Sequence, residues 1–365
     1  MITKEQVIDA LKHVDDPDLK KDLVTLNMIK DVAIDGKNVS FTVVLTTPAC
    51  PMKDMIENAC RNAIIHFVDK DAIVNINMTA NVTSKRNEET LLPGVKNIIA
   101  VASGKGGVGK STITTNLAVA LAKSGSKVGL IDADIYGPSI PTMFGVQNER
   151  LYVNEKDGKQ FMLPIERHGV KMLSIGFLSD PTKAIVWRGP MASKALRQLF
   201  GDAEWGELDY MLIDLPPGTG DIHLTLVSAV PVTGAIIVTT PQEVALADAR
   251  KGVAMFKMDK INVPVLGVVE NMSYFTPAEL PENKYYLFGK DGGKNLSEEM
   301  NIPLLGQIPL VQSIRENGDG GQPQAVEENN AASDAFTMLA GSVAQQIAMR
   351  NANDEPTKKV ETIGY

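Results

Sequence analysis

Cysteine is nearly absent from this sequence: its 365 residues include two, Cys50 and Cys60. Two thiols exclude a disulfide framework, and they also exclude a four-thiolate metal site within one chain. Histidine is scarce too, and the four histidines lie in unrelated segments without the spacing of a metal-binding motif. The sequence is therefore neither that of a disulfide-stapled domain nor that of a single-chain thiolate metal protein.

Basic residues are outnumbered by acidic ones, and long hydrophobic runs are absent from the sequence. Lys and Arg total 36 against 44 Asp and Glu, which argues against a nucleic-acid binder held mainly by phosphate contacts. No apolar run approaches the roughly 20 residues of a membrane span, and residues 1–5 lead into charged sequence without the apolar core of a signal peptide. These absences predict a cytoplasmic protein that binds neither nucleic acid nor membrane.

What is present, 44% hydrophobic and 22% charged residues, is typical of a globular protein. A length of 365 residues predicts one small and one large domain. Residues 1–82 combine helical spacing with two alternating runs joined by Asp35-Gly36, which predicts a small α+β domain. Residues 83–94 are polar and aperiodic, so we expect a linker there. Residues 348–365 are predicted to form a flexible tail.

Residues 95–347 alternate short β-branched runs with helical segments. The runs are almost continuously apolar, as in strands buried on both faces of a parallel sheet. The alternation predicts a doubly wound α/β domain whose ligand lies beyond the carboxyl ends of the strands. The expected strands are 97–102, 127–131, 210–215, 235–240 and 264–270.

A glycine-rich loop follows the first expected strand and precedes a helical run. It fits G-x-x-x-x-G-K-[ST], the phosphate-loop pattern, in the strand–loop–helix context that the pattern requires. Glycines let backbone N–H groups converge on phosphate, Lys110 supplies a cation to the β and γ phosphates, and Ser111 is the expected Mg²⁺ ligand. The predicted nucleotide-binding residues here are Gly104, Lys105, Gly106, Gly107, Val108, Gly109, Lys110, Ser111 and Thr112.

Aspartates follow or end two of the expected strands. Asp132 and Asp134 follow one, and Asp214 ends another in the Walker B pattern, so these carboxylates are candidates for handling Mg²⁺ and water. Gly218 follows in a Pro-Pro-Gly turn, where its backbone N–H could reach the γ-phosphate. Taken singly, each aspartate could equally be a helix cap or a turn residue.

The phosphate loop and several other segments resemble a known family. Lys105 in Lys105-Gly106-Gly107 is typical of the deviant Walker A loop of septum-site and chromosome-partitioning ATPases, arsenite pumps and nitrogenase iron protein. Within that group the sequence resembles the Mrp-type iron-sulfur cluster carriers. Residues 1–82 resemble the small domain often fused to them. Segments 132–139, 187–191, 214–221 and 270–275 carry the resemblance.

The resemblance implies a homodimeric, Mg²⁺-dependent ATPase that sandwiches ATP between subunits. It implies that Lys105 acts on the partner's nucleotide, that Asp134 positions the attacking water and that Asp214 holds the Mg²⁺ shell through water. Asn271 would bind the adenine edge, with Pro309 packing nearby. The alternative for Asn271 is a turn residue at a strand end.

One segment departs from the family pattern. Most relatives continue segment 270–275 with Cys-Pro-x-Cys, and two such pairs in a dimer bridge one [4Fe-4S] cluster. Residues 276–289 contain neither cysteine nor histidine, so the usual ligands are absent. Glu279 and Glu282 are poor substitutes for thiolates, and we expect a solvated loop.

Cys50 is then the candidate iron-sulfur ligand. Pro51 suits the first position of a helix, which would place Cys50 at or near the N-cap, where the helix dipole and Lys53 would lower the thiol pKa. In the related small domains the cysteine of this Cys-Pro segment is considered functional. The alternative is a buried small hydrophobe, which is what we expect for Cys60.

These features favour one function and leave two alternatives. The first hypothesis is an ATP-hydrolysing, nucleotide-gated homodimer that transfers iron-sulfur clusters to apoproteins, with cluster-assembly proteins as further partners. The alternatives are an ATP-switched partitioning or positioning ATPase and an ATP-gated interaction module without direct cluster carriage. Residues 351–365 lack the apolar stripe of a membrane-docking helix, which counts against membrane positioning.

Overall fold

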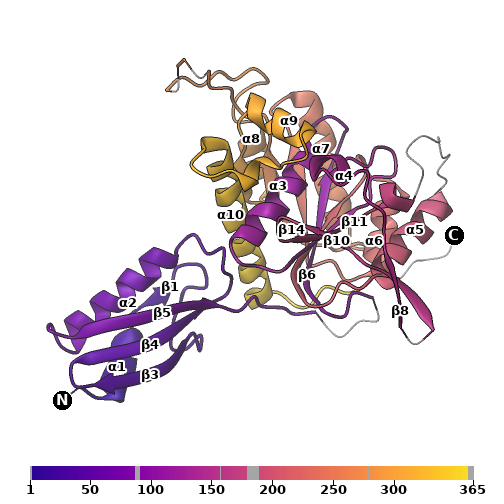
Figure 1. The fold of residues 1–365 in the computed structure, drawn as a ribbon. Helices are drawn as coiled ribbons and strands as arrows, with labels where there is room; N and C mark the ends of the chain where they lie inside the picture. The colour runs from indigo at the N-terminus through magenta and orange to yellow at the C-terminus, as the bar shows by residue number, and fades with distance from the viewer. Residues whose placement is uncertain are drawn as a thin grey trace. The chain divides into compact units, whose positions relative to one another are not determined.

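The computed structural model describes residues 2–86, 91–156, 158–178, 189–277, 279–280 and 282–360. The chain divides into two compact units (Figure 1). The N-terminal unit contains residues 1–83 together with 344–354, and the main unit contains residues 84–343 together with 355–365.

The described residues of the N-terminal unit form a three-stranded sheet that packs against helices. β3 (Ile29–Asp35) and β4 (Asn38–Leu45) are the antiparallel hairpin predicted at Asp35-Gly36, and β5 (Ile73–Ala80) runs parallel to β4. Every second residue of β4 is buried, as its alternating sequence requires. The remaining elements are α1 (Lys4–Leu11), α2 (Lys53–Phe67) and the two-residue strands β1 (Asp15–Asp16) and β2 (Lys21–Asp22).

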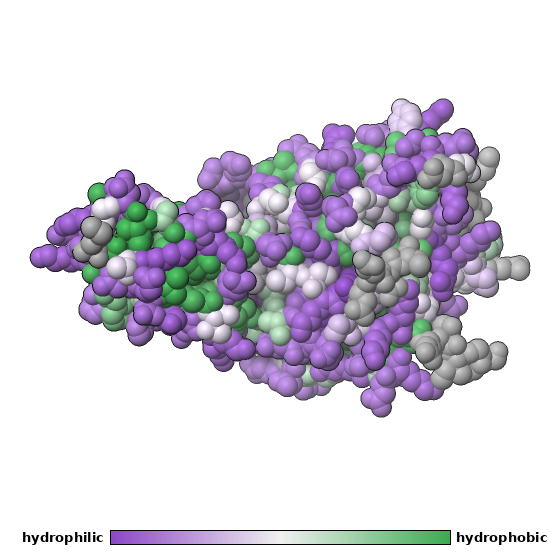
Figure 2. All heavy atoms as spheres, turned by 90° about the horizontal axis from the view of Figure 1, so that it is seen from below, coloured by the Kyte–Doolittle hydropathy of each residue, from purple (hydrophilic) through white to green (hydrophobic). Residues whose placement is uncertain are grey.

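Hydrophobic residues of this unit also reach its surface (Figure 2). Met55, Phe67 and Ile73 are among the large exposed side chains, while Val39 and Phe41 lie in the core. The helix α1 begins at Lys4, where Thr3 and Gln6 cap each other's backbone N–H groups.

The main unit is built on a mostly parallel sheet, eight-stranded within the described residues, with the order β10-β11-β7-β12-β6-β13-β14-β15. Only β10 runs antiparallel to its neighbour in this sheet. The strands are β6 (Val95–Ser103), β7 (Val128–Asp132), β10 (Ile165–Arg167), β11 (Val170–Ser174), β12 (Leu208–Asp214), β13 (Gly234–Thr239), β14 (Val265–Glu270) and β15 (Leu304–Gln307). The doubly wound fold predicted from the sequence is confirmed.

Helices lie on both faces of this sheet (Figure 1). The helices of the main unit are α3 (Lys110–Lys123), α4 (Ile140–Met143), α5 (Gly189–Gly201), α6 (Asp221–Ala229), α7 (Glu243–Lys257), α8 (Gly292–Met300), α9 (Gln312–Asp319) and the first part of α10 (Ala331–Asn353), whose residues from 344 onward belong to the N-terminal unit. A separate hairpin, β8 (Val153–Lys156) and β9 (Lys159–Met162), was not expected from the sequence. Among the described residues, no helix has both the length and the apolar character needed to cross a membrane.

The register of the sheet brings three functional segments together. Asp214 at the end of β12 pairs with Val101 of β6 on one side and with Asp132 of β7 on the other. The phosphate loop leaves the same end of β6, so the loop and both aspartates share one edge of the sheet.

Residues 348–353 do not belong to the flexible tail predicted from the sequence. They form the last turns of α10, where Ala348 and Asn351 are buried. Asn351 Nδ2 donates a hydrogen bond to the Thr83 carbonyl at 3.0 Å. Polar composition suggested a tail, but packing and this hydrogen bond hold the segment in a helix.

Candidate nucleotide site

The phosphate loop joins β6 to α3, in the strand–loop–helix arrangement predicted from the sequence. Gly107 and Gly109 have φ of 82° and 80°, a left-handed conformation that favours glycine. A Cβ on Gly109 would lie 2.3 Å from Asn271 Nδ2, so this glycine also permits a close approach. Loop residues line a cavity of about 210 Å³ together with Asp134 and Pro217.

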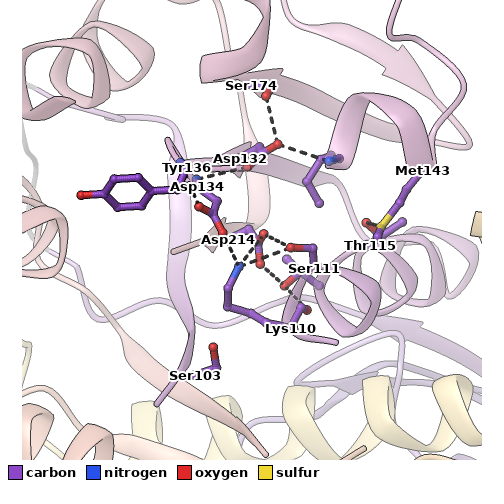
Figure 3. A network of polar contacts seen from close by, with 12 residues as sticks. Ser103, Lys110, Ser111, Thr115, Asp132, Asp134, Tyr136, Met143, Ser174 and Asp214 are labelled. Carbon is purple, nitrogen blue, oxygen red and sulfur yellow. Dashed lines mark hydrogen bonds and ion pairs between the residues drawn. The ribbon is translucent and has the colours of Figure 1, made fainter. Parts of the chain in front are cut away.

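Lys110 lies at the centre of a buried polar cluster (Figure 3). Its Nζ is 2.8 Å from Asp214 Oδ2 and 3.7 Å from Asp134 Oδ2. Ser111 Oγ donates to Asp214 Oδ2 at 2.6 Å, and Thr114 Oγ1 donates to Asp214 Oδ1 at 2.7 Å. The predicted Mg²⁺ ligand, the phosphate-binding lysine and both aspartates therefore meet. Thr114 was missed, although it lies one helical turn after Ser111 and so on the same face of α3.

Asp132 has a different role from its neighbour Asp134. It is fully buried, and its carboxylate accepts hydrogen bonds from Ser174 Oγ at 3.0 Å and from the backbone N–H groups of Asp134 and Ile140, each at 3.2 Å. Burial raises the pKa of Asp132, and the negative charge of Asp214 raises it further. Asp132 thus holds the segment that carries Asp134.

Asp134 lies at the rim of the cluster, with its side chain 13% exposed. Partial burial raises the pKa of Asp134, and the nearby charge of Lys110 opposes that increase. Its carboxylate is therefore close to the phosphate loop and still accessible from the cavity, as a residue that contacts water must be.

A second cavity, of about 540 Å³, adjoins the phosphate loop at Thr112. Met272, Pro309 and Leu310 form part of its wall, and residues of α4, of α9 and of the segments just before these two helices also line it. Asn271 also lines it, although its Nδ2 donates to the Val108 carbonyl at 2.9 Å. The amide oxygen of Asn271 is therefore the atom left to accept a hydrogen bond from a ligand.

The backbone of Gly218 bonds to the end of β6. Its N–H, which the sequence predicts to face the γ-phosphate, donates to the Ser103 carbonyl at 2.8 Å. The turn has a left-handed glycine, with φ of 92°. This bond ties the segment after Asp214 to the end of β6.

Family comparisons agree with this geometry. A model of the NUBPL iron-transfer P-loop NTPases matches residues 94–346, and a model described as iron-sulfur cluster assembly protein matches residues 4–78. The chain belongs to the NUBPL iron-transfer P-loop NTPase family. The resemblance drawn from the motifs is thereby confirmed.

Members of this family with curated names match almost the whole chain. An iron-sulfur cluster carrier protein of Synechocystis sp. is 49% identical over 354 residues, which are 96% of this chain and 99% of that protein. The protein of the same name from Escherichia coli K12 is 44% identical over 347 residues, or 94% and 92% of the two chains. A solved structure, a nucleotide-binding protein from Archaeoglobus fulgidus in complex with ADP, is 39% identical with a TM-score of 0.57, covering 65% of this chain and 91% of that one.

Lys105, which carries the deviant form of the loop in this family, is partly exposed. Lys110 has two carboxylate partners, whereas no ion pair joins Lys105 to any other residue in the described ranges. The Lys105 carbonyl accepts a hydrogen bond from Ser103 Oγ at 3.0 Å. The backbone of Lys105 is therefore held by a hydrogen bond, whereas its ammonium group has no ion-pair partner among the described residues.

Cys50 does not have the low pKa predicted from the sequence. Helix α2 begins at Lys53 with Met52 as its N-cap, so Cys50 lies two residues before the cap. Burial raises the pKa of the Cys50 thiol, and the carboxylates of Asp18 and Asp16 raise it further, against a lowering by the backbone N–H of Met52. The prediction of a thiolate activated by the helix was wrong because these effects outweigh the helix end.

The other residues considered outside the nucleotide site differ in solvent exposure. Cys60 is fully buried in the core of the N-terminal unit, and burial raises its pKa to about 12. Glu279 and Glu282 are exposed, as expected of a solvated loop. In the described ranges, no three His, Cys, Asp or Glu side chains are grouped as a metal site.

Proposed function

We propose that this protein is an iron-sulfur cluster carrier that binds and hydrolyses ATP with Mg²⁺ and transfers clusters to apoproteins. The observation that supports it most is the buried cluster of Lys110, Ser111 and Asp214 beside a phosphate loop, in a chain that relatives named as such carriers match along almost its whole length. Apoproteins and cluster-assembly proteins are its proposed partners, and the cytoplasm is its proposed location.

The residues around Lys110 suit Mg²⁺ and a nucleotide phosphate. Ser111 Oγ and the Asp214 carboxylate are hard oxygen donors 2.6 Å apart, and Asp214 would hold the ion through water. Mg²⁺, when bound, neutralises charge on the transferred phosphoryl group. Lys110 would exchange part of its ion pairing with aspartate for phosphate oxygens, while Asp134 would position the attacking water.

The remainder of the nucleotide would occupy the larger cavity. Asn271 would accept a hydrogen bond from the amino group of adenine through Oδ1, because its Nδ2 already donates to Val108. Pro309 would pack against the base. For Gly218 to donate to the γ-phosphate, its bond to the Ser103 carbonyl must first be exchanged, which makes this turn a natural sensor of that phosphate.

The ammonium group of Lys105, which has no ion-pair partner among the residues that the structure describes, supports a homodimer with ATP between its subunits. A cation at the edge of the phosphate loop, without a carboxylate partner in the described chain, can act on the nucleotide of a second copy. ATP would close such a dimer and hydrolysis would reopen it, so that turnover times the handling of the cluster.

Cys50 is the proposed point of contact with the cluster. The sequence holds its two cysteines in residues 1–83, and Cys50 is the more accessible of the two. Because its pKa is raised, ligation must release the thiol proton, which couples cluster binding to pH. Further ligands would come from a second copy or from the client.

Anaerobic cluster reconstitution tests this function. Wild type, Cys50→Ala and the matched control Cys60→Ala are loaded with iron and sulfide, and bound iron, bound sulfide and visible absorbance are measured before and after an apoprotein acceptor is added. We expect stoichiometric, transferable cluster in wild type and Cys60→Ala and its loss in Cys50→Ala. Equal loading of all three would remove Cys50 from the site, and no cluster in any of them would disprove direct carriage.

A further inference from the structure

After Asn271, which follows β14, the described residues of segment 272–291 form an excursion from the main unit before α8 begins (Figure 1). We call it the β14–α8 loop. Its first and last residues, Met272 and Asp291, have φ of 54° and 58°. Residues other than glycine adopt this left-handed conformation only at a cost in energy, so other contacts must hold both ends of the loop.

A single buried carboxylate contacts both ends. Glu270 is fully buried at the end of β14, and it accepts hydrogen bonds from Ser273 Oγ, from the backbone N–H of Gly293 and, at 2.8 Å, from Gln307 Nε2. A Cβ on Gly293 would lie 2.7 Å from Glu270 Cβ, so the glycine permits this approach. Glu270 therefore contacts both ends of the loop. Ser273 directly follows the left-handed residue Met272, and Gly293 lies two residues after the left-handed residue Asp291.

The base of the loop also shares backbone hydrogen bonds with the wall of the larger cavity. Ile308 N donates to the Glu270 carbonyl at 2.9 Å, and Ser273 N donates to the Ile308 carbonyl at 3.0 Å. Next to these bonds, Leu310 N donates to the carbonyl of Tyr274, the residue after Ser273, at 2.7 Å. The segment containing Ile308 and Leu310 thus lies along the start of the loop.

These three backbone hydrogen bonds form a ladder between the start of the loop and the cavity wall that the proposed nucleotide would contact. Met272, Pro309 and Leu310 line the cavity, and Asn271, next to Glu270 in the chain, is bonded to the phosphate loop through Val108. A ligand that packs on this wall restrains the residues to which the loop is bonded. The same wall residues would lose contacts with the ligand if the ladder opened.

The described part of the loop has order of its own. Phe275 and Tyr285 exchange two backbone hydrogen bonds of 2.8 Å, and Lys284 Nζ lies 4.2 Å from the centre of the Tyr274 ring. Movement at the base would therefore be passed to Tyr285 and to the exposed Leu287 beyond it.

We propose that Glu270 is a positioning residue that couples nucleotide occupancy of the larger cavity to the conformation of the β14–α8 loop. The coupling rests on the proposed nucleotide binding. Nucleotide favours the arrangement in which Glu270 holds both Ser273 and Gly293. Because coupling between two sites is reciprocal, the loop in this arrangement strengthens nucleotide binding by the same factor.

Limited trypsin digestion of the full-length protein with and without MgADP tests the coupling, because Lys284 provides a cleavage site inside the loop. Glu270→Gln replaces one acceptor oxygen by an NH₂ group, which cannot accept from Ser273 or Gly293. Glu298→Gln makes the same chemical change on the exposed face of α8 and serves as the control. The affinity for MgADP is measured separately for each protein.

We expect MgADP to slow cleavage after Lys284 by about fivefold or more in wild type and Glu298→Gln, and by less than about twofold in Glu270→Gln. Ser273→Ala, which removes one donor and leaves Glu270 in place, should also weaken the protection and serves if Glu270→Gln does not fold. A purely structural role would speed cleavage equally with and without MgADP. Undiminished protection in both variants, or none in a wild type that binds MgADP, overturns the coupling alone; a wild type that does not bind MgADP overturns the nucleotide site as well.

Discussion

Lys110 and Asp214 are both buried, and each has the other as its closest ionic partner, at 2.8 Å. Removing the Lys110 charge would leave the Asp214 carboxylate without its ionic partner in the interior, which is far more costly than losing an exposed pair, whereas Lys110 without Asp214 would keep only the longer ion pair with Asp134. The two hydroxyl donors on Asp214 satisfy more of its lone pairs. In the proposed function, a nucleotide phosphate would therefore enter a site where charge and hydrogen-bonding groups are already arranged, as electrostatic catalysis requires.

At the scale of single residues, the chemistry of Cys50 is set by its neighbours more than by its place near a helix. Burial and two carboxylates raise its pKa, so less thiolate is present at neutral pH than for an ordinary cysteine. As the proposed cluster ligand, Cys50 would bind iron only with release of its thiol proton. We expect it to react slowly with alkylating agents at neutral pH, because the thiolate is the nucleophile.

We therefore predict that Asp18→Asn accelerates the alkylation of Cys50 by iodoacetamide at neutral pH. Removing the carboxylate charge lowers the Cys50 pKa and raises the thiolate fraction, by about two- to threefold for a modest shift. As the pH rises through the Cys50 pKa of wild type, the two rates should converge. Mass spectrometry at Cys50 measures the rate, and buried Cys60 provides an unreactive reference in the same molecule.

Asp9→Asn, on the exposed face of α1, is the matched control and should leave the rate unchanged. An equal rate in wild type and Asp18→Asn would show that the Asp18 charge does not contribute to the raised pKa of Cys50.

At the scale of elements, the phosphate loop depends on how closely α7 packs against the end of β6. A Cβ on Gly104 would lie 2.2 Å from the backbone carbonyl carbon of Asp248 in α7. Backbone atoms cannot move aside as a flexible side chain can. The first glycine of the motif thus has a packing role in addition to its place in the phosphate pattern.

Gly104→Ala should lower the free energy of unfolding of the main unit by about 2 kcal/mol, because α7 must shift to admit the methyl group. Gly106→Ala is the matched control in the same loop: its Cβ would have no neighbour closer than 3.9 Å, and we expect a change within about 0.5 kcal/mol. Urea unfolding followed by tryptophan fluorescence reports this unit, since both tryptophans lie within residues 84–343. Equal stability of the two variants would contradict the packing role.

At the scale of the whole molecule, the proposed dimer makes each active site depend on two chains. Lys110 belongs to the site of its own chain, where two aspartates hold it, while Lys105 has no such partner in the described ranges. If Lys105 acts across the interface, losing Lys110 damages the site of the same chain, whereas losing Lys105 damages the site of the partner chain.

We predict that Lys105→Ala and Lys110→Ala are each nearly inactive in ATP hydrolysis and that mixing them restores activity. In the mixed dimer, the Lys105→Ala subunit binds ATP and receives Lys105 from its Lys110→Ala partner, so an equal mixture should reach about a quarter of wild-type turnover. Lys105→Ala alone should still bind nucleotide. Phosphate release measures turnover, with the exposed Lys260→Ala as the control. Full turnover of Lys105→Ala, or no recovery of activity on mixing, would contradict the action of Lys105 on the partner's nucleotide.

Several elements were predictable because the sequence patterns that specify them are local. The glycine-rich loop, the apolar strands that precede it and Asp214, and the Asp35-Gly36 hairpin all follow from spacing over fewer than about ten residues. The strands β10, β11 and β15 were missed because they are short and their pairing is set by the sheet. Residues 348–353 looked like a tail because their helix depends on contacts distant in the chain.

The sequence by itself determined the doubly wound fold and the position of the phosphate loop, since backbone conformation and hydrophobic periodicity encode them locally, and the resemblance of its motif segments indicated the family. Only the tertiary structure decided which atoms meet: that Asp132 holds the segment of Asp134, that Thr114 joins the Asp214 cluster, and that Glu270 binds both ends of the β14–α8 loop. It also reversed the expected pKa shift of Cys50. Burial and charge at a residue are sums over neighbours from distant segments, and no local pattern contains them.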